Sequence, residues 1–283
     1  MSRRLLRRRC AGLVLVCGLA VAARGHGADP EKLEELAAAL RRAPDDPALL
    51  VAQARLLVEH GDHGVARRNL DRVDALAPGA YPTDDVRGLL LFDEGDLSGA
   101  ADLLDRAVLR APAEIEPRLW RARVRRALGR RDAALEDYLA VWRATSRPTG
   151  DLTLEVAEAL VAGGRTADAA AVLQRGIASV GQVPSLLVRL IDLEVARGRP
   201  ADALPWAEAM QSRSARPEPW MARRAELLEL AGRADEARAA WTQLDAHLAR
   251  LPNLERGSPA LRPVVERVAR ARASSVTPIS PVR

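Results

Sequence analysis

The sequence predicts an all-α protein built from repeated pairs of helices, and three observations support this prediction. Of its 283 residues, 48% are hydrophobic but only 3% are aromatic. Alanine and leucine dominate the apolar residues, and small or unbranched aliphatic side chains favour packed helices over sheet. A glycine followed five residues later by an alanine recurs along the chain at nearly constant spacing. Recurrence at a fixed period indicates tandem repeats.

The repeated unit is marked by two parallel series of residues. The glycines are Gly61, Gly95, Gly129, Gly164, Gly198 and Gly232, and the alanines are Ala66, Ala100, Ala134, Ala169, Ala203 and Ala237. Both series advance in steps of 34, 34, 35, 34 and 34 residues. Two series that share one period predict an array of six repeats.

Each repeat is predicted to be a helical hairpin. In the first repeat, Leu50, Ala54, Leu57 and Val58 form an apolar stripe at helical spacing. The stripe stops just before Gly61, and glycine can adopt the left-handed conformation that ends a helix. The alanine early in the second helix lets two backbones approach closely. Later positions of that helix supply equivalent core residues, namely Leu70, Leu104, Tyr138, Leu173, Ala207 and Trp241.

These units resemble tetratricopeptide repeats, whose helix–turn–helix pattern of 34 residues has small residues at the eighth and twentieth positions. The eighth positions here are Ala54, Gly88, Ala122, Ala157, Ile191 and Ala225, of which five are small. The resemblance covers residues 47–251 and implies a right-handed α-solenoid, a superhelix of six hairpins. Their predicted bounds are 47–80, 81–114, 115–148, 150–183, 184–217 and 218–251.

Four residues depart from the family pattern. Arg125 and Glu194 occupy a position that is usually large and apolar, and Gly176 replaces a usual alanine. Pro205 falls inside a predicted helix, where it removes a backbone hydrogen bond and is expected to bend the helix. We therefore expect local distortion in the third and fifth repeats.

The flanks are predicted to seal the two ends of the array, because terminal repeats otherwise expose apolar faces. Residues 28–46 are expected to hold an N-terminal capping helix, since Asp29 and Pro30 are typical of a helix start and leucines follow at helical spacing. Residues 252–283 are expected to contain a last amphipathic helix over 260–273, followed by a disordered tail rich in serine and proline.

Residues 1–27 have the pattern of a secretory signal peptide. Five arginines precede an apolar run from Ala11 to Ala23, and small residues follow. The run is shorter than the roughly 20 residues that a spanning helix needs. Membrane attachment through an uncleaved signal, or through a lipid on Cys17, is the less favoured alternative, since Val16 precedes that cysteine. We expect a periplasmic or secreted protein, exported by the general secretory or the twin-arginine route.

The signal peptide also accounts for the basic character of the whole chain. Residues 1–27 carry six arginines and no acidic residue, so the formal charge of +5 falls to −1 in the remaining chain, with 37 basic and 38 acidic residues. A nucleic-acid partner is therefore not expected. Both cysteines, Cys10 and Cys17, lie in the same segment. The remaining chain has no thiol for a disulfide, a nucleophile or a thiolate metal site.

No residue pattern predicts an enzyme, a cofactor or a metal. The glycines of Gly163–Arg165 lack the spacing and the lysine of a phosphate-binding loop, and are expected to end a helix. The run Glu59–His63 could bind a metal through His60, Asp62 and His63, but an exposed turn is favoured. Two acid pairs, Asp45 with Asp46 and Asp84 with Asp85, lie near predicted helix starts. Helix capping is favoured over acid–base catalysis for them.

The resemblance implies that the first helix of each hairpin lines a concave groove. The ninth repeat positions in that groove are Arg55, Leu89, Arg123, Glu158, Asp192 and Glu226, with Arg126 and Glu229 adding to the basic and acidic halves. This change of sign predicts that an extended ligand of opposite charge polarity binds in one direction. The alternative is that these residues are the solvated faces of amphipathic helices.

The resulting functional prediction is an exported, non-catalytic scaffold that binds a protein or peptide partner. A family subclass grips C-terminal carboxylates with lysines and asparagines, but Lys32, Asn69 and Asn253 are the only such residues here, so that clamp is missing. The alternative is a structural or assembly component of an envelope machine for polysaccharide export, respiratory protein maturation or outer-membrane biogenesis.

Overall fold

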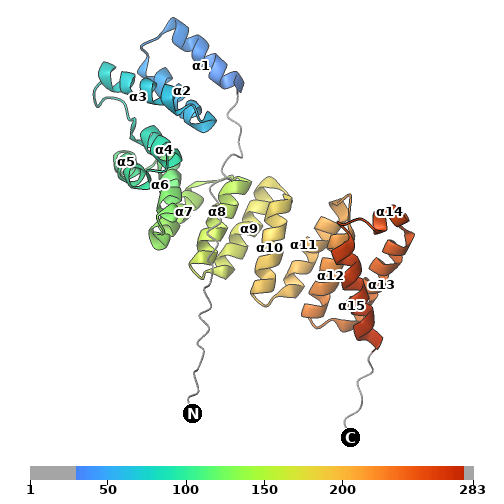
Figure 1. Ribbon diagram of the computed structural model, residues 1–283. Helices are drawn as coiled ribbons and strands as arrows, with labels where there is room; N and C mark the ends of the chain where they lie inside the picture. The colour runs from blue at the N-terminus through green and yellow to red at the C-terminus, as the bar shows by residue number, and fades with distance from the viewer. Residues whose placement is uncertain (1–29, 277–283) are drawn as a thin grey trace, which may run out of the picture. The chain divides into compact units, whose positions relative to one another are not determined.

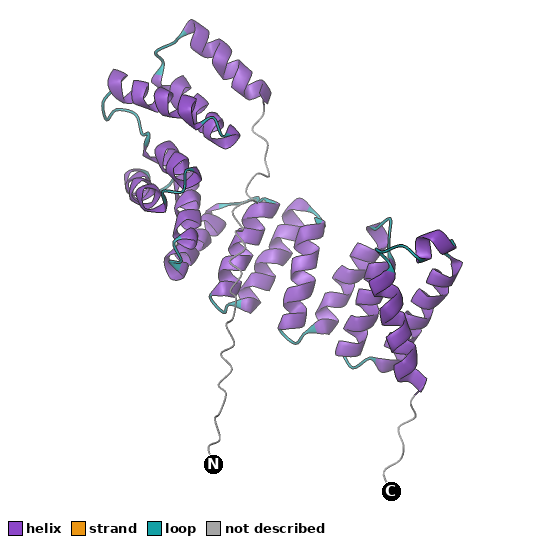
Figure 2. Cartoon of the chain, in the orientation of Figure 1, coloured by secondary structure: helices purple, strands orange, loops and turns teal. Residues whose placement is uncertain are grey.

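The computed structural model describes residues 30–276, and the regular secondary structure in this range is entirely helical (Figures 1 and 2). Residues 1–29 and 277–283 lie outside the described part, and the predicted signal peptide falls among them. The prediction of an all-α protein is confirmed.

The described helices follow one another as α1 (Pro30–Arg42), α2 (Pro47–His60), α3 (His63–Leu76), α4 (Asp84–Asp93), α5 (Leu97–Arg110), α6 (Ile115–Ala127), α7 (Arg131–Ala144), α8 (Gly150–Ala162), α9 (Thr166–Val180), α10 (Pro184–Ala196), α11 (Pro200–Arg213), α12 (Glu218–Leu230), α13 (Ala234–Arg250), α14 (Asn253–Arg256) and α15 (Arg262–Val276). From α2 to α13 they alternate between the first and the second helix of a hairpin. The helical hairpins predicted from the repeat are therefore confirmed.

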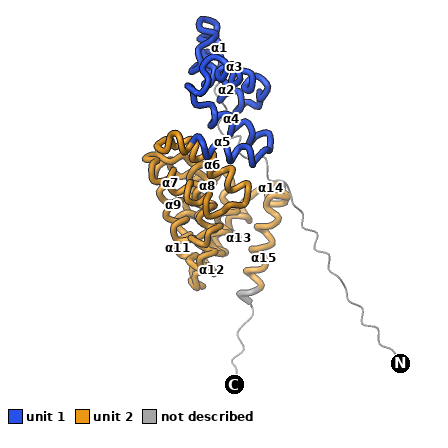
Figure 3. Tube along the Cα trace, turned by 90° about the vertical axis from the view of Figure 1, so that its left-hand side faces the viewer, with its two compact units in different colours: residues 1–107 blue, residues 108–283 orange. Residues whose placement is uncertain are grey.

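The chain forms two compact units, residues 1–107 and residues 108–283, with the boundary inside α5 (Figure 3). Unit 1 contains the hairpin of α2 and α3 together with α1 and α4. Unit 2 contains four complete hairpins, from α6 to α13, and then α14 and α15. Most of the predicted groove residues lie in unit 2, because it has the longer run of repeats.

The two residues that mark each repeat have the roles that the sequence predicts. All six repeat glycines have a positive φ, between 71° and 86°. Gly61 has a left-handed backbone conformation, and its N–H donates to the carbonyl of Val58. This conformation ends α2. The six repeat alanines are at most 2% exposed. These buried alanines allow the two helices of each hairpin to pack closely.

The core of unit 2 runs through its hairpins without interruption. One group of buried residues joins α6 to α10, and a second joins α10 to α15. Trp206 and Met210 of α11 pack against both groups. The predicted core residues Tyr138, Leu173 and Ala207 are fully buried. Each hairpin thus covers the apolar side of its neighbour, as repeat architectures require.

The four unusual repeat residues are accommodated without a break in any helix. Arg125 and the buried Glu194 each have an ionic partner, Asp137 at 2.8 Å and Arg197 at 2.9 Å. Helix α11 continues through Pro205. The helices of the third repeat, α6 and α7, and those of the fifth, α10 and α11, are therefore uninterrupted.

Gly176 has a packing role in the fourth repeat. A Cβ atom at this position of α9 would lie 2.2 Å from Cγ2 of Thr153 in α8. Thr153 is fully buried, and its hydroxyl donates to the carbonyl of Thr149 at 2.7 Å. The missing alanine methyl is thus offset by a larger residue on the facing helix.

The flanking helices differ from each other in how well they are buried. At the C-terminal end, Leu261, Val264 and Val268 are at most 4% exposed, and α15 packs against α12 and α13. Helix α15 continues to Val276, three residues beyond the predicted helix end, and the short helix α14 precedes it. The rest of the predicted disordered tail lies outside the described residues. At the other end, α1 packs against α2, but its leucine stripe is only half-buried.

Candidate partner-binding face

A row of ion pairs joins the successive first helices of unit 2. Arg123 of α6 donates two hydrogen bonds to Glu155 of α8, at 3.0 Å and 2.8 Å. The next connections, from α8 to α10, from α10 to α12 and from α12 to α15, are Glu158 with Arg189, Asp192 with Arg223 at 2.9 Å, and Glu226 with Arg267 at 3.1 Å. We call these eight residues the ion-pair ladder.

The repeat spacing explains why the ladder forms. Its members occupy the sixth and ninth positions of their repeats, three residues apart, so both lie on one face of a helix. From the third to the sixth repeat, the ninth residue of one repeat contacts the sixth residue of the next, and the two carry opposite charges. Arg267 has the equivalent place on α15, where no full repeat follows. Four of the predicted groove residues, Arg123, Glu158, Asp192 and Glu226, are thus brought together on one face.

The other predicted groove residues have different surroundings. Leu89 in unit 1 is only 2% exposed, so it belongs to the core. Arg55, also in unit 1, pairs with Asp85 of α4. In unit 2, Glu229 accepts a hydrogen bond from the indole N–H of Trp241 at 2.6 Å, while the exposed Arg126 lies 5.9 Å from the centre of the Tyr138 ring.

The ladder changes the electrostatic interpretation of the groove. The acidic residues Glu158, Asp192 and Glu226 each pair with an arginine of the following first helix. Their charges are therefore balanced locally. The half of the groove that the ninth positions predicted to be acidic thus carries less net negative charge. The arginine partners were not predicted because the sixth positions were not compared with the ninth positions of the preceding repeats. Opposite charges 31 or 32 residues apart, close to the repeat period, were the signal that could have found them.

Aromatic side chains lie at the α6 end of the ladder. The guanidinium of Arg123 stacks over the ring of Trp120, 4.3 Å from its centre. The phenol of Tyr138 donates a hydrogen bond to Oε2 of Glu155 at 3.0 Å. Burial, and then the nearby Glu155 carboxylate, raise the pKa of Tyr138 above its ordinary value. The phenol therefore keeps its proton and remains a donor.

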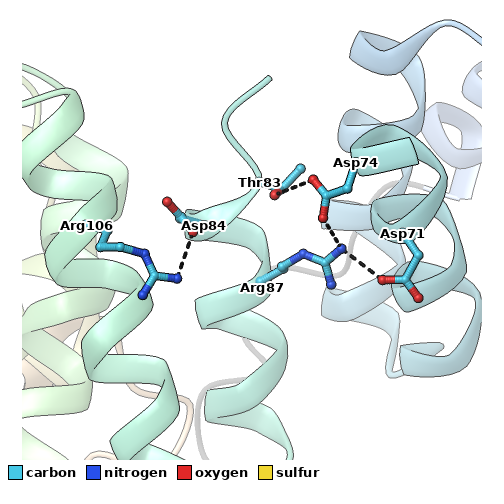
Figure 4. A network of polar contacts seen from close by, with 6 residues as sticks. All are labelled: Asp71, Asp74, Thr83, Asp84, Arg87 and Arg106. Carbon is cyan, nitrogen blue, oxygen red and sulfur yellow. Dashed lines mark hydrogen bonds and ion pairs between the residues drawn. The ribbon is translucent and has the colours of Figure 1, made fainter. Parts of the chain in front are cut away.

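Unit 1 contains a separate polar network that joins α3, α4 and α5 (Figure 4). Arg87 of α4 contacts both Asp71 and Asp74 of α3, at 2.9 Å and 2.6 Å. Arg106 of α5 contacts Asp84 at 3.1 Å, in the first turn of α4. Together with the bond from Thr83 to Asp74, these contacts connect neighbouring helices. Asp84 thus has a structural role in the first turn of its helix.

The other candidate sites of the sequence are also structural or exposed. Asp46 caps α2, because its carboxylate accepts hydrogen bonds from the N–H groups of Ala48 and Leu49. His63 lies 3.4 Å from the carboxylate of Asp93. Within residues 30–276 no three histidine, aspartate or glutamate side chains are grouped so as to hold a metal. The helices of this range also include none with the length and apolar character of a membrane span.

Comparison with known proteins identifies the fold. No protein-family model and no curated protein matches the sequence. The C-terminal part of a TPR repeat-containing protein from Cytophaga hutchinsonii matches with a TM-score of 0.58 and 14% identity, over 84% of this chain and 93% of that one. The pilF protein of Pseudomonas aeruginosa matches with a TM-score of 0.53 and 12% identity, over 86% and 99% of the two chains. Yeast Tom70 matches with a TM-score of 0.50 and 14% identity, over 84% of this chain and 47% of the Tom70 chain.

At these identities the likeness concerns the fold alone. The helices pack pairwise as the hairpins of tetratricopeptide repeats do, which confirms the predicted fold. The resemblance that the sequence suggested from its period of 34 residues is thus reproduced in three dimensions.

Proposed function

We propose that this protein is an exported, non-catalytic scaffold that binds a protein or peptide partner on the ladder face of unit 2. The observation that supports this proposal most strongly is the row of charged side chains shared by α6, α8, α10, α12 and α15. Proteins with this fold generally bind protein partners and are typically not enzymes. Helix surfaces also hold side chains in place more precisely than loops do.

The ion pairs suit this face to binding because they fix the side chains in advance. Each member is already held by its neighbour, so these side chains lose less conformational entropy when a partner binds. Pairing does not exhaust the polar groups, since a guanidinium has five N–H donors and a carboxylate has several acceptor positions. Glu158 and Asp192 keep 49% and 55% of their side-chain surface exposed. A peptide backbone or polar side chains can therefore bond to this face while the ladder stays intact.

A charge inversion tests this proposal. We expect the double variant Glu158→Arg with Arg189→Glu to keep the ion pair and the stability but to reverse the local charge pattern. The partner, identified by crosslinking in the native envelope and then purified, should bind this variant about tenfold more weakly, or about 1.4 kcal/mol. Titration calorimetry measures the affinity, and thermal unfolding checks the fold.

The matched control inverts an ion pair outside the ladder. Glu208 and Arg224 lie 2.9 Å apart with similar exposure, 54% and 30% of their side chains. Exchanging their charges should leave the affinity within about twofold. If the partner binds the ladder inversion as tightly as it binds this control, the ladder face is not the binding surface.

We further propose that residues 1–27 direct the protein out of the cytoplasm and are then removed. The arginine-rich start and the apolar run Ala11–Ala23 support this proposal. Fusion of residues 1–40 to alkaline phosphatase, which is active only after export, should give activity that is lost when the run is interrupted by charged residues. N-terminal sequencing of the extracted protein should begin after Ala22 or after Gly27. Full-length protein found only in the cytoplasmic fraction would contradict the proposal.

A further inference from the structure

The third hairpin, formed by α6 and α7, concentrates positive charge. Residues 115–148 contain nine arginines and four acidic residues, a net charge of +5. The chain after residue 27 has a net charge of −1, so everything else in it sums to −6. The same hairpin also holds Trp120, Tyr138 and Trp142 in a chain with only 3% aromatic residues. One hairpin thus differs in charge and aromatic content from the rest.

Part of this positive charge is balanced inside unit 2. Arg121 and Arg125 both contact the buried carboxylate of Asp137, at 2.6 Å and 2.8 Å. Arg123 is held by Glu155 in the ladder. These three arginines have structural partners and contribute little net charge to the surface.

Three other arginines surround the turn between α6 and α7. Arg126, Arg130 and Arg131 are exposed, and none of them has a carboxylate partner among residues 30–276. Arg126 lies in the last turn of α6, and Arg131 begins α7 after the turn at Gly129. We call these three residues the turn arginines. Their charge faces solvent and is available to a ligand.

Arg126 continues the ladder face along α6, and Arg130 and Arg131 follow it across the turn. Trp120, Arg123 and Arg126 follow one another at intervals of three residues, so they lie along one face of α6. Arg126 occupies the twelfth repeat position, where the three following repeats have Val161, Val195 and Glu229. Since the ladder pairs cancel one another, the uncompensated charge at the α6 end of this face is positive.

We propose that the partner presents an acidic segment, and that its aspartate or glutamate side chains bind the turn arginines at the α6 end of the ladder. This inference rests on the proposed function and names the chemistry of the partner. Guanidinium groups suit it because they bind carboxylates through two parallel hydrogen bonds. Opposite charge also accelerates encounter and fixes the direction of the bound segment. An acidic segment has no comparable site along the remaining ladder, where every arginine already has a carboxylate.

The test uses a defined peptide instead of the natural partner. A fluorescein-labelled peptide of twelve residues, rich in aspartate and glutamate, is titrated with the mature protein, residues 28–283. Fluorescence anisotropy measures the binding. We expect binding that weakens with added salt, and no binding of the amide analogue in which each acid is replaced by asparagine or glutamine. The variant Arg126→Glu with Arg130→Glu should lower the affinity for the acidic peptide at least tenfold.

A matched variant separates a local site from overall charge. Arg250→Glu with Arg262→Glu makes the same change in net charge, and its two positions also lie in the last turn of one helix and at the start of another. We expect this control to change the affinity less than twofold. The neutral variant Arg126→Gln with Arg130→Gln should also weaken binding, and it avoids placing an acid at the C-terminal end of α6.

Several results would overturn the inference. Equal losses in both charge-reversal variants would show only general electrostatic attraction, and tighter binding of a single-stranded oligonucleotide than of the peptide would point to a different class of ligand. Absence of peptide binding would also overturn the inference. The purified natural partner separates the two proposals. If it binds the ladder-inversion variant more weakly but binds the turn-arginine variants normally, the scaffold function is supported and the acidic segment is contradicted.

Discussion

Replacing Asp137 by alanine is expected to lower the free energy of unfolding by about 3 kcal/mol, because it removes one carboxylate from between two largely buried guanidinium groups. The side chain of Asp137 is 6% exposed, and those of Arg121 and Arg125 are 16% and 18% exposed. Water can therefore compensate only part of the lost interaction. Chemical denaturation followed by circular dichroism measures the change.

Two further variants test the cause of this loss. Asp137→Asn keeps the size of the side chain but removes its charge, so it should also destabilise the protein, by somewhat less than alanine. Glu208→Ala removes a carboxylate that is 54% exposed and contacts a single arginine, and should cost no more than about 0.5 kcal/mol. Similar losses for Asp137→Ala and Glu208→Ala would contradict the proposed importance of burial.

Replacing Gly176 by alanine is expected to destabilise the protein by about 2 kcal/mol, the cost of overpacking a tight contact. Alanine is the better helix former, so propensity alone would stabilise α9 by about 1 kcal/mol. The added methyl would, however, lie within 2.8 Å of the Cγ2, Oγ1 and Cβ atoms of Thr153. Cβ cannot rotate away, so α8 and α9 must separate. Thermal unfolding shows which effect is larger.

A second substitution should restore the lost stability. Thr153→Ala removes two of the three contacted atoms, and alone it should leave a small cavity next to Gly176. Combined with Gly176→Ala, it should give a protein at least about 1 kcal/mol more stable than the sum of the single changes predicts. Additive effects of the two substitutions would mean that this contact does not limit helix packing.

The fold could be predicted from the sequence because the repeat positions have strict steric requirements. At Gly61 and its equivalents the backbone has a positive φ, which glycine adopts readily. At Ala66 and its equivalents the side chain is buried between close helices. A period of 34 or 35 residues makes such requirements visible six times in one chain. Element bounds at the C-terminal end, where no repeat guides them, were predicted less well.

The candidate site was predicted only in part because charge pairing depends on two repeats at once. Arg123, Glu158 and Asp192 occupy the ninth position, but each pairs with a residue of the next repeat. Leu89 follows the same numbering and is nevertheless buried. Position within a repeat indicates which way a residue points, whereas its partner depends on the helix that packs beside it.

The ladder also restricts the order in which the repeats of unit 2 can be joined. Without the fourth repeat, Arg123 would face Arg189, and two like charges would meet where an attractive pair now forms. Loss of the fifth repeat would instead place Glu158 opposite Arg223, and loss of the sixth would place Asp192 opposite Arg267. Both junctions would still bring opposite charges together. Gene duplication or deletion could therefore lengthen or shorten the array from its C-terminal half, while the junction after the third repeat requires one particular successor.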